Sequence, residues 1–165
     1  MMRYIYLIIL GLFFSVINME ANNSASISLV PCPTNVVSGT GSFQFTPKTV
    51  FAVETEEQAD IVRLLSDQFT CAAGFTPKLK VDSKKGNLVL QTDKTIKSEA
   101  YCLEITPKKI TVKASDAKGF FYALQSIRQL LPPAIESAVK VDGTEWIVPA
   151  MTITDEPRFG YRGLM

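Results

Sequence analysis

Short apolar segments alternate with clusters of turn-forming residues between residues 27 and 53 of the chain. The apolar segments are rich in β-branched and aromatic residues, and the clusters between them contain Pro, Gly, Ser and Thr. The first composition favours strands and the second favours turns. The pattern predicts three short strands, ISLV at 27–30, SFQF at 42–45 and TVFAV at 49–53, with turns at PCPT, SGTG and TPK.

The next segment has the periodicity of an amphipathic helix whose two ends are both marked. Thr55 and Gln58, three residues apart, form a capping box, and Gly74 is the kind of residue that commonly ends a helix. Apolar residues recur at helical spacing between these two ends. The predicted buried face contains one polar member and consists of Ile61, Leu64, Leu65, Gln68, Phe69 and Ala72.

Alternation of apolar and polar positions returns further along the chain. It predicts strands at 87–91, 99–106 and 109–114, in which every second side chain shares one face. Only Pro107 and Lys108 separate the last two strands. A connection this short predicts an antiparallel hairpin.

A second amphipathic helix and a last strand complete the pattern. The helix is predicted at 117–131, where Pro132 and Pro133 end it, and the strand is predicted at 145–154. The apolar stripe of this helix consists of Phe120, Ala123, Leu124, Ile127, Leu130 and Leu131. Two helices with mostly antiparallel strands predict an α+β fold of two layers, with both helices on one face of the sheet.

Composition narrows the classes of function. The chain has 165 residues, of which 47% are hydrophobic and 20% charged, as is typical of one globular domain. Its formal net charge is +1, whereas nucleic-acid binders carry a basic excess, so we expect no nucleic-acid partner. The chain contains no histidine, the commonest general base and metal ligand. Hydrolysis that uses carboxylates remains compatible with this composition, as in glycosidases.

The first residues have the anatomy of a secretory signal peptide. In residues 1–21, Arg3 precedes an apolar run from Tyr4 to Ile17, and cleavage is predicted after Ala21. The alternative is a membrane anchor, but the run is shorter than the roughly 20 residues that span a bilayer. We therefore expect an exported protein, periplasmic or secreted, with no membrane span after cleavage.

The three cysteines, Cys32, Cys71 and Cys102, are widely spaced and odd in number. This spacing matches neither a disulfide framework nor a metal site. We expect buried, inert thiols, and a single bridge between Cys71 and Cys102 is the alternative.

Two segments carry a resemblance to a known family. KGFFYALQSIRQLLPP at 118–133 resembles the second helix of the domain that precedes the barrel in family-20 glycoside hydrolases, the β-N-acetylhexosaminidases. DEPRFGYRGLM at 155–165 resembles the passage from that domain into the first barrel strand, and its DxPRFxxRG pattern is the more specific part. The hairpin at 99–114 is similar to the same domain, so the resemblance covers about residues 29–165.

The resemblance implies a domain organisation. Residues 1–21 would be the signal peptide, residues 22–154 the N-terminal α+β domain, and residues 155–165 a linker with the truncated first strand of a (β/α)8 barrel. The family's barrel holds the catalytic Asp-Glu pair, so this chain is expected to contain no catalytic residue and to be inactive alone. The expected partners are the enzyme's own barrel and a glycan with terminal N-acetylglucosamine or N-acetylgalactosamine. No cofactor and no metal are implied.

One substrate-binding residue follows from the resemblance. Arg162, in the Arg-Gly pair of DxPRFxxRG, is similar to an arginine that binds hydroxyls of the terminal sugar. A planar fork of donors suits two adjacent hydroxyl groups. The alternative role for Arg162 is an ion pair between the two domains.

Other residues invite functional interpretations that the sequence does not favour. Asp155 and Glu156 are adjacent acids, but Asp155 is predicted to be a capping or ion-pairing residue, and Arg158 an interdomain anchor. Phe120, Phe121 and Tyr122 could suggest a sugar-stacking platform, but Phe120 lies on the core stripe. The other two are expected to pack beside it or against the barrel. A stand-alone carbohydrate-binding or protein-interaction module is the alternative function for the whole chain.

Overall fold

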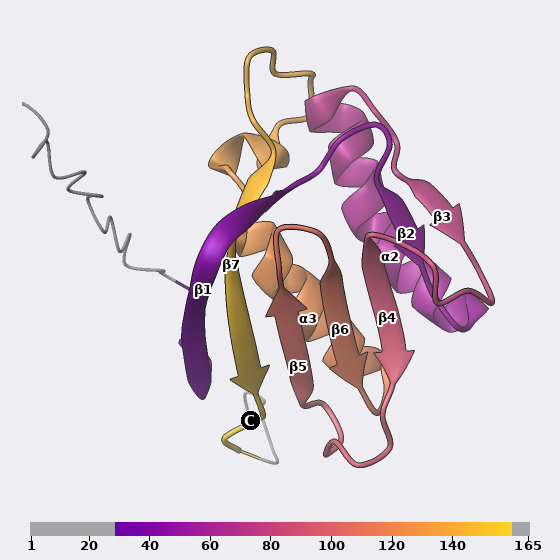
Figure 1. The fold of residues 1–165 in the computed structure, drawn as a ribbon, viewed down its shortest axis with the longest axis vertical. Coiled ribbons are helices and arrows are strands. Elements are labelled where there is room, and N and C mark those ends of the chain that lie inside the picture. The colour runs from indigo at the N-terminus through magenta and orange to yellow at the C-terminus, as the bar shows by residue number, and fades with distance from the viewer. Residues whose placement is uncertain (1–28, 160–165) are drawn as a thin grey trace, which may run out of the picture.

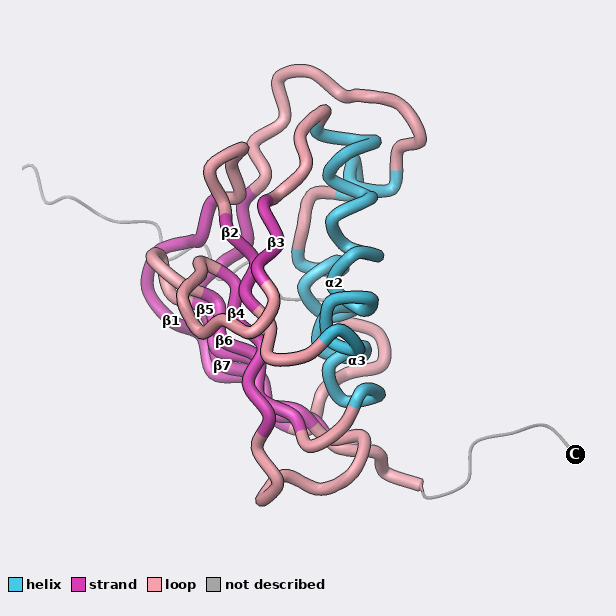
Figure 2. Tube along the Cα trace, turned by 90° about the vertical axis from the view of Figure 1, so that its right-hand side faces the viewer, coloured by secondary structure: helices cyan, strands magenta, loops and turns pink. Residues whose placement is uncertain are grey.

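The computed structural model describes residues 29–159, which form a seven-stranded sheet with two α-helices on one face (Figures 1 and 2). The strand order is β1-β7-β5-β6-β4-β2-β3. The predicted α+β fold of two layers is confirmed. The strands are β1 (Asn35–Gln44), β2 (Val50–Ala52), β3 (Lys78–Lys80), β4 (Leu88–Thr92), β5 (Tyr101–Ile105), β6 (Ile110–Ala114) and β7 (Ile147–Asp155). The helical segments are α2 (Glu56–Gln68), the π-helix η1 (Phe69–Ala73), α3 (Ala117–Leu130) and the 3₁₀-helix η2 (Pro133–Glu136).

The sheet is antiparallel on one side and parallel on the other. The antiparallel ladders of β7 with β1, β5 with β6 and β5 with β7 pair seven, five and five residues. The parallel ladders of β2 with β3, β2 with β4 and β4 with β6 pair three, two and five. Antiparallel pairing therefore predominates by residue, as predicted. The β2–β3 pair is parallel because α2 carries the chain back along the sheet between them.

Strand β1 is longer than predicted. The SGTG cluster, predicted as a turn, lies inside β1, and the register with β7 shifts between Ser38 and Ser42. Gly41 has φ +87°, and a Cβ on Gly39 would lie 3.1 Å from the Ala150 backbone. These glycines make a bulge in a long edge strand, which is why their turn signal was misleading.

One further strand prediction was wrong, and one strand was not predicted. Leu29 and Val30, the described part of the segment predicted as a strand at 27–30, are not in a strand. The strand β3 was not predicted, because its three residues include two lysines and directly follow Pro77, so they lack the usual apolar pattern.

Helix α2 begins and ends as its sequence predicts, but it buries a different face. The Gln58 N–H donates to Thr55 Oγ1 at 3.2 Å, and Gly74 adopts the left-handed conformation after η1. Leu64, however, is 54% exposed, while Gln58 and Val62 are buried. The prediction for Leu64 was wrong because the sheet contacts a stripe one position away from the one that the apolar residues suggested.

Helix α3 is capped by Asp116 and lies close to the sheet. The Gly119 N–H donates to Asp116 Oδ1 at 2.9 Å. A Cβ on Gly119 would lie 2.4 Å from the Ala100 carbonyl oxygen, so a side chain would not fit between the helix and β5. The stripe predicted for this helix is buried except for Leu130, which is half-buried. The hairpin of β5 and β6 is also confirmed.

The prediction for the cysteines was wrong. Cys32 and Cys71 are exposed, Cys102 is half-buried, and all three thiols are free. Cys102 alternates with the buried Tyr101 and Leu103 on β5, so it lies on the sheet face opposite the helices. Cys71 belongs to the helical layer, which means that the sheet separates the two residues of the predicted bridge.

Candidate functional site

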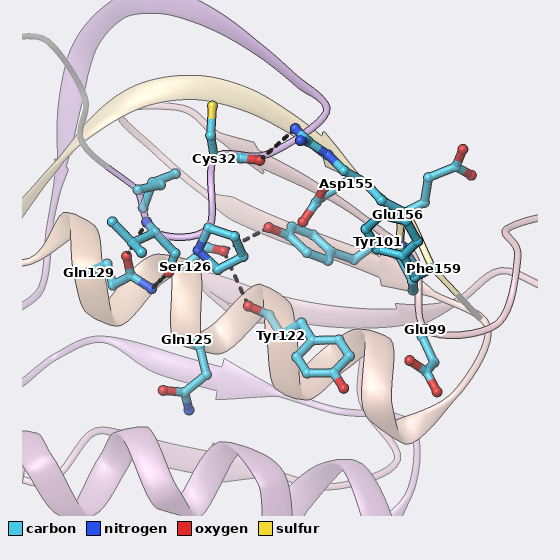
Figure 3. A pocket seen from close by; sticks show the side chains of 15 residues that line it. Cys32, Glu99, Tyr101, Tyr122, Gln125, Ser126, Gln129, Asp155, Glu156 and Phe159 are labelled. Atoms are coloured by element: carbon cyan, nitrogen blue, oxygen red, sulfur yellow. Dashed lines mark hydrogen bonds between the residues drawn. The ribbon is translucent and has the colours of Figure 1, made fainter. Parts of the chain in front are cut away.

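A cavity of about 380 Å³ lies where β7 ends (Figure 3). One wall is the segment of residues 29–34, which we call the strap, and α3 and the chain after β7 form the others. We call this space the exit cavity, because the described chain leaves the sheet beside it. It is lined by Leu29, Val30, Pro31, Cys32, Glu99, Tyr101, Tyr122, Gln125, Ser126, Gln129, Asp155, Glu156, Pro157, Arg158 and Phe159.

Hydrogen bonds hold the strap in place. The Gln129 amide accepts from the Val30 N–H at 2.8 Å and donates to the Val30 carbonyl oxygen at 3.0 Å. Asp155 Oδ1 accepts from the N–H and the hydroxyl of Thr34 at 3.0 and 3.1 Å. Arg158 donates to the Cys32 carbonyl oxygen at 3.4 Å. The strap therefore joins α3 to the end of β7.

The floor of the exit cavity is a tyrosine–serine pair. The Tyr101 and Ser126 hydroxyls are 2.7 Å apart, and Ser126 Oγ lies 3.2 Å from the Tyr122 carbonyl oxygen (Figure 3). Burial raises the pKa of Tyr101 to about 12, although the Ser126 hydrogen bond acts in the opposite direction. The phenol stays protonated at neutral pH, so it cannot serve as a base there.

The acidic side chains around the cavity have structural partners. Asp155 binds Thr34, which agrees with its predicted capping role, and Glu156 pairs with Lys97 at 2.8 Å. Glu99 pairs with Lys118 at 2.7 Å. The two adjacent acids therefore contact different elements and do not form a paired acid and base.

A second, much smaller hollow lies between α2 and α3. Leu64 and Phe121 line it, and 54% and 37% of their surfaces are exposed. Arg128, which also lines it, forms an ion pair with Glu136 of η2. The hydrogen bonds that Arg128 donates to the Glu136 carboxylate raise the pKa of Arg128 and lower the pKa of Glu136. Leu64 and Phe121 are thus two exposed apolar side chains in one small hollow of the helical layer.

The predicted site residue Arg162 lies outside the described residues, as does the predicted signal peptide. Phe120 is buried, as predicted, Phe121 lines the hollow between the helices, and Tyr122 lines the exit cavity. Arg158 binds the strap within the described structure. Residues 29–159 contain no cluster of three or more metal-ligating side chains. None of the helices within that range is long and apolar enough to span a bilayer.

The sequence did not predict that the strap and Gln129 help to form the exit cavity. Gln129 and Val30 are 99 residues apart in the chain, and Thr34 and Asp155 are 121 apart. Neither a motif nor a periodicity marks such pairs, because their contact exists only after the sheet and α3 have formed.

Similarity searches match the chain to one family. The model of "Glycosyl hydrolase family 20, domain 2" matches residues 26–156. A beta-hexosaminidase of Porphyromonas gingivalis is 32% identical over 143 residues, which are 84% of this chain and 18% of the relative. A beta-hexosaminidase of Vibrio furnissii is 30% identical over 147 residues, which are 89% of this chain and 22% of the relative.

A solved structure has the same fold. The N-acetyl-beta-hexosaminidase of Streptomyces plicatus superimposes with a TM-score of 0.74 at 30% sequence identity, over 80% of this chain and 26% of that chain. That enzyme has also been solved, as a mutant, in complex with the product GlcNAc. The family and fold inferred from the sequence motifs are thus confirmed. The chain spans only about a fifth to a quarter of the length of these three relatives.

Proposed function

Because the chain belongs to glycosyl hydrolase family 20 as a β-hexosaminidase N-terminal domain, we propose that it is the non-catalytic part of an exported β-N-acetylhexosaminidase. The enzyme would remove terminal β-linked N-acetylhexosamine from glycans. The observation that carries this proposal is the match of the family model to residues 26–156, together with the fold shared with the Streptomyces plicatus enzyme. Residues 22–154 would form the domain and residues 155–165 the passage to a (β/α)8 barrel.

The proposed reaction is substrate-assisted hydrolysis with retention. A carboxylic acid protonates the leaving oxygen while the carbonyl oxygen of the substrate's 2-acetamido group attacks the anomeric carbon, so the glycosidic bond breaks as an internal ring forms. Water then opens that ring and restores the acetamido group. A neighbouring Asp orients the acetamido group and stabilises its charge. Both carboxyl groups would lie in the barrel.

The described residues support a non-catalytic role for this part of the enzyme. Catalysis of this kind needs a carboxyl group that can transfer a proton. The carboxylates around the exit cavity instead bind Thr34, Lys97 and Lys118, and the phenol of Tyr101 stays protonated. The domain's task would be to support the barrel and to deliver Arg162 to it.

Arg162 is proposed to bind two hydroxyl groups of the terminal sugar. Its guanidinium presents donors in a fixed plane and stays charged at any working pH, which suits neutral vicinal hydroxyls. A lysine would keep the charge but lose the bidentate geometry.

Activity measurements test the proposal. The 165-residue chain alone should hydrolyse no chromogenic N-acetylglucosaminide or N-acetylgalactosaminide, whereas the full-length enzyme should hydrolyse at least one. Turnover by the pure chain would contradict the non-catalytic role. A full-length protein inactive on both substrates would contradict the proposed reaction and favour a binding module.

In the full-length enzyme, Arg162→Lys should lower kcat/KM by about 100-fold, equivalent to about 2.7 kcal/mol of transition-state binding. The loss of one or two charge-assisted hydrogen bonds accounts for an effect of that size. Arg63→Lys is the matched control, since Arg63 lies on the exposed side of α2 with Asp60 and Glu56. A lower Tm with unchanged kcat/KM would show that Arg162 is only an interdomain ion pair.

Export is proposed from the apolar run at residues 4–17 and the small residue at position 21. The mature protein should begin near Asn22 and be found in the periplasm or the medium. N-terminal sequencing of the product from the native host checks this. A product that keeps Met1 and stays in the membrane fraction would identify the segment as an anchor.

A further inference from the structure

We propose that the exit cavity is the seat for an apolar side chain of the catalytic part of the same enzyme, with the strap as one of its walls. The inference rests on the proposed function, since the occupant belongs to the part of the enzyme expected after residue 165. It goes further by naming the surface that receives that part and by giving the N-terminal strap a role in the contact between the two domains.

Position is the first reason. The last described residue, Phe159, lines the exit cavity, so the described chain ends at this surface. In the Streptomyces plicatus enzyme the matched region is 26% of the chain, which leaves a large part of that protein to lie elsewhere. Figure 2 shows the described chain after β7 passing to the side of the sheet that carries the helices. The cavity therefore opens where the next part of the enzyme would lie.

Exposed apolar surface at the rim is the second reason. Val30 is 73% exposed and Phe159 is 71% exposed, and the two residues lie at the same cavity. Single exposed apolar residues are common, but two at one apolar cavity favour a surface that another part of the protein covers. Covering such side chains stabilises the complex in proportion to the apolar area that is removed from water.

The state of the polar groups inside the cavity is the third reason. The hydroxyls of Tyr101 and Ser126 bind each other, Asp155 binds Thr34, and Gln129 binds the Val30 backbone. A sugar would need free donors and acceptors aimed at its hydroxyl groups, whereas these groups are engaged with the protein. The interior therefore suits an apolar side chain better than a glycan.

The strap makes the seat possible. Leu29 is 6% exposed and anchors the start of the strap, while Gln129 and Asp155 hold its backbone on the two sides of the cavity. Without these contacts the cavity would lack one wall. The N-terminal segment of the mature protein would thus take part in placing the catalytic domain.

The test introduces a charge at the rim and compares the chain alone with the full-length enzyme. In the chain alone, Val30→Asp should leave the Tm nearly unchanged, because an exposed position tolerates substitution. In the full-length enzyme the same carboxylate would be covered without a partner, which is strongly unfavourable. Trypsin cleavage after Arg158 should then become at least about tenfold faster, which corresponds to about 1.4 kcal/mol of lost docking.

The matched control is Val139→Asp. Val139 is 70% exposed, as Val30 is 73% exposed, but it lies in the loop between η2 and β7, at the opposite end of β7 from the exit cavity (Figure 1). This variant should leave both the Tm and the rate of cleavage after Arg158 unchanged in both proteins. If Val30→Asp destabilises the chain alone, Val30→Asn takes its place, since it also puts a polar side chain at the same exposed position.

Three results would overturn the proposal. The first is a full-length enzyme in which the rim variants and Val139→Asp are cleaved at the same rate. The second is saturable binding of N-acetylglucosamine to the chain alone that Val30→Asp abolishes, which would make the cavity a sugar site. The third is a concentration-dependent dimer of the chain alone that Val30→Asp disrupts. Each readout is independent of hexosaminidase activity, so the seat and the proposed reaction can fail separately.

Discussion

The two ends of β7 are stabilised in different ways. Where β7 begins, Trp146 packs edge-on against Phe69, with ring centroids 6.1 Å apart, and Phe69 in turn packs against Phe45 at 4.7 Å and Phe75 at 5.6 Å. Where β7 ends, the chain encloses the exit cavity, and hydrogen bonds hold the strap there. We call these the aromatic end and the exit end.

The difference separates what the chain completes by itself from what it leaves for a partner. Aromatic packing at the first end buries Phe69 fully and Trp146 to 6% exposure. The exit end keeps Val30 and Phe159 exposed. Apolar burial stabilises a fold in proportion to area, whereas a hydrogen bond at the surface contributes little because water competes for it. Stability should therefore concentrate at the aromatic end.

We expect the largest effect on stability from a substitution at the aromatic end. Phe69→Ala should lower the free energy of unfolding by about 3–5 kcal/mol, because it removes a buried ring and leaves a cavity among three other rings. Urea unfolding of the chain alone measures the change. Phe159→Ala at the exit end is the control and should change stability by less than about 0.5 kcal/mol. Similar losses for the two variants would remove the distinction between the ends.

An intermediate effect is expected at the start of α3, the helix that forms one wall of the exit cavity. Asp116→Ala should destabilise the chain by about 0.5–2 kcal/mol, the usual range for a lost helix cap. The carboxylate also accepts from the Ser98 hydroxyl and from the Glu99 N–H. Urea unfolding at neutral pH tests this, with Asp142→Ala as the control because the Asp142 side chain is 83% exposed. Equal effects of the two variants would contradict the capping role.

The same carboxylate predicts a dependence on pH. Burial raises the pKa of Asp116, but hydrogen bonds from Ser98, Gly119 and Glu99, with the charge of Lys118, hold it below its ordinary value of 3.8. A pKa that is lower in the folded state contributes stability above pH 3.8 and loses it as the pH falls through the folded value. Between neutral and acidic pH, the free energy of unfolding should therefore fall less steeply for Asp116→Ala than for the wild type. If the free energies of unfolding of the two proteins fell in parallel with pH, Asp116 would not contribute to the pH dependence.

We expect the smallest effect on stability from a substitution that releases the strap. Gln129→Ala removes both hydrogen bonds to Val30, but water can replace them, so the global loss should be about 1 kcal/mol or less. The local effect should be clearer, with faster hydrogen exchange of the Val30 amide and unchanged exchange in β5. Gln44→Ala at the exposed end of β1 is the control. Unchanged exchange at Val30 would show that Gln129 does not hold the strap.

The sequence-based predictions were accurate where they depended on residues close together in the chain, and less accurate where they depended on tertiary contacts. The Thr55 cap, the Gly74 stop and the β5–β6 hairpin depend on residues a few positions apart, and all were confirmed. The burial of Leu64 was predicted wrongly, because a helix with apolar residues on a wide arc does not reveal which part of that arc meets the sheet.

The two helices and their limits, the β5–β6 hairpin, the α+β class and the family could be derived from the sequence, because capping residues, periodicity and the DxPRFxxRG pattern act within short stretches of chain. The tertiary structure alone decided the bulge in β1, the separation of Cys71 from Cys102 by the sheet, and the exit cavity with its strap. The contacts that build the strap join residues 99 and 121 positions apart. Such pairs meet only after the sheet has brought the two ends of the described chain to the same side of α3, and that information is not contained in either segment alone.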